Sequence, residues 1–284
     1  MDVLTAISLC SGYEGLSLGL KRAIPNVRTV CYVERETYAV ANLVAKIKEG
    51  KLDDAPIWDD LATFDPKPFE GMVHIIHGGY PCQGFSVAGK RLGTKDPRWV
   101  WPHIARIVEA VRPVWCIFEN VAGHLTMGFP EVYRSLRNMG YSVEAGLFTA
   151  AEVGSSMAEG KRLFILAQAE SFAGDILQGW GYEGQGKADT GRASKILGKA
   201  NSRRLQGLRS AESRRGNEFT PASFAVAPQG IYQESWEAKR ALEPGLDRTA
   251  YESRSRVDRL RLLGNGVVPQ CAEKAIRTLG ALFE

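Results

Sequence analysis

The chain alternates short apolar runs with longer amphipathic segments. Runs rich in Val, Ile and Leu predict buried strands, at residues 3–9, 30–34, 72–77, 114–118, 143–149 and 161–167. Apolar positions at helical spacing predict helices, at residues 16–20, 37–48, 101–111, 131–139 and 271–282. Strands that alternate with helices predict an α/β fold with a mainly parallel sheet.

The first predicted strand breaks into a glycine turn, Cys10-Ser11-Gly12-Tyr13-Glu14-Gly15, before a helical pattern. Strand, glycine turn and helix are typical of a nucleotide-type cofactor site, because free backbone N–H groups and the helix N-terminus face the ligand. A tight turn without a ligand has the same pattern. Glu34 ends the second predicted strand, where an acid in a Rossmann-like fold binds ribose hydroxyls, although a lone acid there is also typical of a solvated strand end.

Two further strand ends carry reactive groups. The run 72–77 breaks into Gly78, Gly79, Pro81 and then Cys82, which predicts an accessible thiol on a braced turn. Glu119 follows the run 114–118, and partial desolvation of a carboxylate there raises its pKa and suits it to share a proton with a substrate. Taken alone, Glu119 could equally be a strand cap.

Composition narrows the class of protein. Among 284 residues there are five cysteines, without a Cys-x-x-Cys pair or a His/Cys cluster, which argues against a disulfide framework and a zinc site. Reduced thiols, a start without a leader pattern and the lack of a membrane-length apolar run predict a cytoplasmic protein. The net charge of +4 permits a polyanionic partner without establishing one.

Basic residues concentrate after about residue 171, in a stretch rich in Gly, Ser and Ala. Such a run is usually a solvated surface, and in a protein that binds nucleic acid it would contact the phosphate backbone. The segment 90–98, also basic, is either a solvated loop or a mobile lid.

Residues 79–89, Gly-Tyr-Pro-Cys-Gln-Gly-Phe-Ser-Val-Ala-Gly, resemble the nucleophile loop of the cytosine carbon-5 DNA methyltransferases. Glu119-Asn120-Val121 and the stretch 264–269, Gly-Asn-Gly-Val-Val-Pro, resemble two further blocks of that family in the same order. The resemblance implies a Rossmann-like class I methyltransferase sheet and a smaller, irregular target-recognition region. We expect a catalytic and cofactor-binding domain at 1–169, the recognition region at 170–255, and a segment at 256–284 that completes the catalytic domain.

The resemblance also implies roles for single residues. Cys82 attacks carbon 6 of the cytosine, Glu119 holds ring nitrogen 3 and the exocyclic amine, and Arg162 contacts the base carbonyl. S-adenosylmethionine is the implied cofactor, and no metal is needed. The residues implied to hold this cofactor are Cys10, Ser11, Gly12, Gly15, Glu34, Asp60, Asn265 and Val267. For the adenine amine, Asp60 is chosen over its neighbour Asp59, which is the alternative.

The chain departs from the family pattern at several positions. Ser8 replaces the usual acid before the glycine turn, Cys10 replaces a Phe and Glu14 replaces a Gly. Ala158 and Gly160 stand where a Gln and an Arg are usual, so only Arg162 of that block is in register.

The resemblance implies a monomeric DNA (cytosine-5-)-methyltransferase of the bacterial or phage kind that flips its target base out of double-stranded DNA. A role in restriction-modification or genome protection follows, with a separate cognate restriction endonuclease as an allowed partner. Two rival hypotheses are a transfer-RNA cytosine-5 methyltransferase and a DNA-binding homologue with weakened catalysis.

Overall fold

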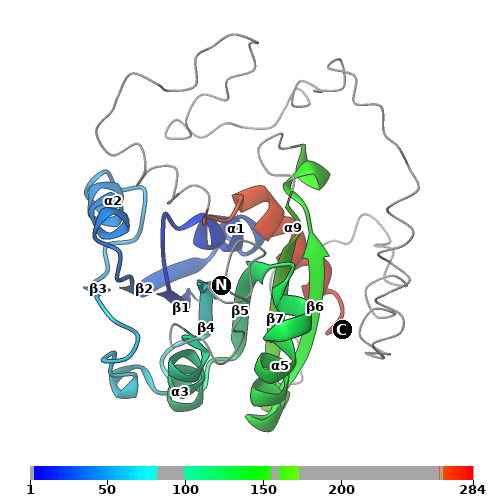
Figure 1. Ribbon diagram of the computed structural model, residues 1–284. Coiled ribbons are helices and arrows are strands. Elements are labelled where there is room, and N and C mark those ends of the chain that lie inside the picture. The colour runs from blue at the N-terminus through cyan, green and yellow to red at the C-terminus, as the bar shows by residue number, and fades with distance from the viewer. Residues whose placement is uncertain (1–2, 82–98, 155–159, 173–261, 263–264, 284) are drawn as a thin grey trace, which may run out of the picture.

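The computed structural model describes residues 3–81, 99–154, 160–172, 262 and 265–283 of the chain (Figure 1). Cys82, the segment 90–98, Ala158 and nearly all of the expected recognition region lie outside these residues. Within them, no helix is long and apolar enough to cross a membrane.

The described residues form an α/β fold, built on one seven-stranded sheet in the order β3-β2-β1-β4-β5-β7-β6. Its strands are β1 (Leu4–Leu9), β2 (Val27–Val33), β3 (Ile57–Trp58), β4 (Ile75–Gly79), β5 (Trp115–Val121), β6 (Tyr141–Phe148) and β7 (Arg162–Ala169). The pairs from β3 to β5 are parallel, whereas β7 is antiparallel to both β5 and β6. The carboxyl ends of β1, β2, β4 and β5 therefore meet at one edge, where the predicted site residues lie.

Helices cover both faces of the sheet (Figure 1). On one face α3 (Trp101–Val111) and α5 (Phe129–Asn138) bury their apolar sides against residues such as Ile76 and Phe118. On the other face α1 (Gly15–Ala23) and α9 (Pro269–Gly280) lie side by side over Ile75 and Ile117. The helix α2 (Thr37–Lys48) packs on Tyr32 near the β3 edge.

Shorter helices complete the described part: α4 (His124–Met127) and the 3-10 turns η1 (Lys67–Phe69), η3 (Ala150–Val153) and η4 (Glu170–Phe172). The close approach of α1 and α9 depends on Gly19, since a Cβ there would lie 2.5 Å from that of Ala272. The C-terminal helix thus packs on the first helix of the chain.

Most predicted elements occur close to the expected bounds, and α2 and α3 match theirs at both ends. Two details differ. The stretch at residues 56–61, where no strand is predicted, contains the short strand β3, which pairs with Tyr32 and Val33. Glu119, expected to follow its strand, lies inside β5, because Glu119 to Val121 continue the antiparallel pairing with β7.

Candidate functional site

The turn after β1 has an unusual backbone. Cys10, Gly12 and Glu14 have positive φ angles of 52°, 57° and 69°, the left-handed region that only glycine enters without strain. For Cys10 and Glu14 this conformation costs on the order of 1 kcal/mol each, so the surrounding contacts must hold the turn in place. The Glu14 side chain makes no capping hydrogen bond to α1, so the first backbone N–H groups of this helix lack a side-chain cap.

Three hydrogen bonds close the turn in a ring. The hydroxyl of Ser8 donates to the Glu14 carboxylate, the backbone N–H of Glu14 donates to the Ser11 carbonyl at 2.9 Å, and the Ser11 hydroxyl donates to the Ser8 carbonyl at 3.2 Å. All three residues are buried. Burial raises the pKa of Glu14 to about 7, an effect that the nearby hydroxyls of Ser8 and Ser17 oppose.

Glu34, directly after β2, holds the middle of this turn. Its carboxylate accepts from the backbone N–H of Gly12 at 2.7 Å and from that of Glu36 at 2.8 Å. Each carboxylate oxygen has a second acceptor site, so Glu34 can still receive two hydroxyl groups of a ribose. The sequence-predicted pair of glycine turn and acid therefore meets in the fold.

The segment before α9 closes against the same turn. The hydroxyl of Tyr13 donates to the carbonyl of Val267. A Cβ on Gly15 would lie 2.0 Å from that carbonyl, and one on Gly266 would lie 1.6 Å from the Tyr13 ring, so both positions require glycine. Asn265 is exposed next to them. Residues more than 250 positions apart thus form one wall of the site.

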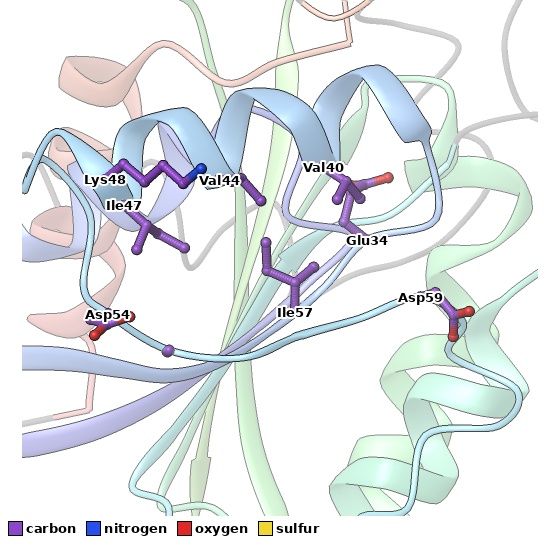
Figure 2. A pocket seen from close by; sticks show the side chains of 9 residues that line it. Glu34, Val40, Val44, Ile47, Lys48, Asp54, Ile57 and Asp59 are labelled. Carbon is purple, nitrogen blue, oxygen red and sulfur yellow. The ribbon is translucent and has the colours of Figure 1, made fainter.

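A hollow of about 540 Å³ continues from Glu34 under α2 (Figure 2). Val40, Val44 and Ile57 line its middle, and Glu34 and Asp59 lie at one end. Asp60 is not one of the residues that line this hollow. Its Oδ1 accepts from the N–H of Ala62 at 2.9 Å and caps the following turn. A carboxylate oxygen of Asp60 still has acceptor sites free for a ligand amine.

A second group of residues lies at the ends of β4 and β5. Arg162 donates to Oε1 of Glu119 at 3.3 Å, and Glu119 is only 3% exposed. Burial raises the pKa of Glu119 to about 7, although the Arg162 charge acts in the opposite direction. Gly79 faces this carboxylate, and a Cβ there would lie 3.0 Å from Glu119 Oε2. A carboxyl group with such a pKa can share a proton near neutral pH.

Asn120 ties the two strand ends together. Its amide donates to the carbonyl of Tyr80 at 3.2 Å, and its Oδ1 accepts from the N–H of Val121 at 2.9 Å. The Tyr80 hydroxyl is 2.7 Å from Nε2 of His124, and burial lowers the pKa of His124 to about 3. The chain is thus anchored two residues before Cys82.

The sequence prediction named Asn120 only as part of a motif and did not single out Tyr13, Tyr80 or His124. The Asn next to Glu119 was a usable signal for the first of these. Nothing in the local pattern marks Tyr13 or His124, since their partners are distant in sequence.

The protein is thus an α/β protein in which one edge of the sheet combines the glycine turn, held by Glu34, with the buried Glu119–Arg162 pair. A sequence profile described as C-5 cytosine-specific DNA methylase matches residues 4–202. The chain therefore belongs to the C-5 cytosine-specific DNA methylase family.

Curated relatives agree with this assignment. The Type II methyltransferase M.NgoMIV of Neisseria gonorrhoeae is 32% identical over 171 residues, 58% of this chain and 52% of that protein. The Type II methyltransferase M.NaeI of Lentzea aerocolonigenes is 33% identical over 163 residues, 54% of this chain and 37% of that protein. The chain thus spans about half or less of the length of these two relatives.

Among solved structures, the Entamoeba histolytica methyltransferase EhMeth matches with a TM-score of 0.50 at 17% identity, over 67% of this chain and 62% of that one. This likeness supports the predicted methyltransferase type of α/β fold.

Proposed function

We propose that this chain is a DNA (cytosine-5-)-methyltransferase that uses S-adenosylmethionine and acts on a cytosine flipped out of double-stranded DNA. Family membership supports the reaction class, and the Type II relatives support a role in restriction-modification. The observation that carries the proposal is the buried Glu119–Arg162 pair beside Gly79, three residues before Cys82.

The glycine turn, Glu34, Asp60 and the segment before α9 together form what we call the cofactor cradle. Their hydrogen-bonding groups fit those of an S-adenosyl group. The uncapped α1 N-terminus and the glycine turn suit the methionine part, Glu34 suits the ribose hydroxyls and Asp60 suits the adenine amine. Cys10, Ser11, Gly12, Gly15, Asn265 and Val267 would complete the walls. The cofactor supplies an electrophilic methyl group.

The proposed chemistry begins at Cys82. Its thiolate adds to carbon 6 of cytosine and pushes an electron pair to carbon 5, which then takes the methyl group. Loss of the carbon-5 proton and β-elimination of the thiolate restore the aromatic ring. The short distance along the chain supports this role. Cys82 follows Gly79 by three residues, which span at most about 11 Å, so Cys82 must lie within that distance of the residue beside Glu119.

Glu119 and Arg162 would stabilise the base during this addition. A protonated Glu119 donates to ring nitrogen 3, where negative charge accumulates, and the exocyclic amine donates to its other oxygen. Arg162 donates to the carbonyl oxygen at carbon 2. Since Arg162 already contacts Glu119, the bound base would share this guanidinium with the carboxyl group.

The proposed domain division has the C-terminal segment, 256–284, complete the catalytic domain. Packing of α9 on α1 and the Tyr13–Val267 contact support this proposal. The recognition region at 170–255 stays a prediction.

The test is a covalent trap with 5-fluorocytosine in duplex DNA and S-adenosylmethionine. We expect a denaturation-resistant adduct with the intact chain and none with Cys82→Ala. Cys116→Ala is the matched control, because Cys116 is fully buried in β5 and burial raises its pKa, so its loss should leave the adduct.

The substrate is tested by expressing the chain in a host free of cytosine methylation and sequencing bisulfite-treated DNA. Protected cytosines within one recurring short sequence would support the proposal. Methyl transfer to transfer RNA but not to DNA would replace it with the RNA hypothesis. Binding of cofactor and DNA without transfer would favour the weakened homologue.

A further inference from the structure

The carboxylate of Glu14 occupies an unexpected place. Glu14 lies near the end of the glycine turn, yet its side chain returns to the end of β1 and accepts from the hydroxyl of Ser8. Glu14 is 2% exposed and has a left-handed backbone, a conformation that glycine adopts more readily. A buried acid at a strained position requires a compensating role.

We propose that Glu14 is a cofactor-positioning residue, which supplies from the far side of the turn the carboxylate that residue 8 of this chain lacks. The family resemblance implies this exchange, because Ser8 stands where the family pattern has an acid and Glu14 stands where that pattern has a Gly. The two departures are reciprocal, and the structure joins them by a hydrogen bond. The inference rests on the proposed cofactor.

The ring of hydrogen bonds explains how Glu14 acts at a distance. Ser8, Ser11 and Glu14 each give one bond and receive one, so loss of the carboxylate opens the ring. Gly12 lies inside the closed turn and donates to Glu34. An open ring would therefore displace both the Gly12 N–H and the carboxylate that suits the ribose.

The surroundings of Glu14 make its charge state measurable. The groups that act on its carboxylate are the hydroxyls of Ser8, Ser11 and Ser17, the Lys21 charge of α1 and, from β2, the phenol of Tyr32. On β4, His77 pairs in register with Ser8, but burial lowers the pKa of His77 to about 3 and keeps it neutral. Near pH 7, Glu14 is the group of this cluster expected to titrate.

The test is a double-mutant cycle on the full chain, with cofactor affinity measured by calorimetric titration of S-adenosylmethionine and stability by the melting temperature. Glu14→Gly removes the acid, and Ser8→Asp places two acids in one buried site. We expect each single change to weaken binding at least about tenfold at pH 8, since one lost charged hydrogen bond is worth a factor of that order. The double variant should return to within about threefold of the original chain.

Two controls keep the outcome clear. Glu109→Gln, an exposed acid on α3, should change neither quantity. Glu14→Gln should weaken binding at pH 8 but not at pH 5.5, where Glu14 of the original chain is itself protonated. A loss of binding that depends on pH indicates a positioning role for the Glu14 carboxylate, because a packing role would not depend on its charge. This comparison can still be made if Glu14→Gly or Ser8→Asp fails to fold.

The proposal is overturned if the double variant is as weak as the weaker single variant, or if Glu14→Gly binds as tightly as the original chain. If the original chain does not bind S-adenosylmethionine, the proposed cofactor fails and the positioning role fails with it. The melting temperatures of the two single variants and the double variant then still show whether an acid at residue 8 can replace the acid at residue 14 in stabilising the turn.

Discussion

Arg162 and Glu119 form an ion pair across the antiparallel strands β5 and β7, with 3.3 Å between Nη1 and Oε1. Glu119 is almost fully buried, whereas a quarter of the Arg162 side chain is exposed. The pair thus lies where β5 ends beside the start of β7, with its guanidinium partly open to solvent.

We expect Arg162→Gln to lower the methylation rate by about 10² to 10³, because one preorganised donor to developing charge is removed. Cofactor affinity should stay unchanged. The measurement is single-turnover methyl transfer, with Arg134→Gln as control, since Arg134 lies exposed on α5 and donates only to the nearby Pro130 carbonyl among the described residues. A rate within twofold of the original chain would remove Arg162 from base binding.

Glu119 should make stability depend on pH. Its pKa is about 7 in the folded chain against 4.5 ordinarily, so between these values the folded state holds a proton that the unfolded state lacks. The stabilisation that Glu119 gives the folded state is therefore complete below pH 4.5, and it is lost as the pH rises to about 7. Glu119→Gln should remove this dependence, worth up to about 3 kcal/mol, in denaturant unfolding at pH 5 and pH 8. Identical pH curves for the two chains would contradict the raised pKa.

Asn120 should couple stability to catalysis. Asn120→Ala leaves the Tyr80 carbonyl and the Val121 N–H without their partner, at a cost of about 1 to 3 kcal/mol in unfolding free energy. Because the chain continues from Tyr80 to Cys82, adduct formation should slow while cofactor affinity is retained. Asn138→Ala, exposed at the end of α5, is the control for both measurements. Unchanged adduct kinetics would limit Asn120 to a structural role.

Asp60 and Asp59 can be separated by amide substitutions. Asp60→Asn keeps an oxygen for the Ala62 N–H, so the turn should survive while cofactor affinity falls about tenfold through loss of a charged acceptor. Asp59→Asn should have little effect. If instead Asp59→Asn weakens binding, the adenine contact lies one residue earlier, beside Glu34 in the hollow of Figure 2.

Gly266 should tolerate no side chain. Gly266→Ala forces a methyl group into the Tyr13 ring and should weaken cofactor binding at least tenfold, because the Tyr13–Val267 contact must open. Gly160→Ala is the matched control, since no atom of the described residues lies within 4 Å of a Cβ there. Equal cofactor affinity in the two variants would show that the C-terminal segment does not shape the cradle.

Local sequence patterns determined much of the fold. Apolar runs located β1, β4 and β5, and helical periodicity gave α2 and α3 their bounds, because both signals depend on which side of one element is buried. The glycine turn and Glu34 were predicted as a pair, and they meet through the Gly12 N–H. Cys82, the expected nucleophile, remains a prediction from its motif.

Only the tertiary structure decided which distant residues share a contact. That Glu119 continues its strand depends on antiparallel β7, and that Tyr13 reaches Val267 depends on α9 packing against α1. Ser8 and Glu14 read as two separate departures in the sequence, yet the left-handed turn brings them into one hydrogen bond. The sequence by itself thus determines elements and reactive groups, whose signals are local. Chain reversals, packing and backbone strain decide their pairing, because these arise only when the whole chain has folded.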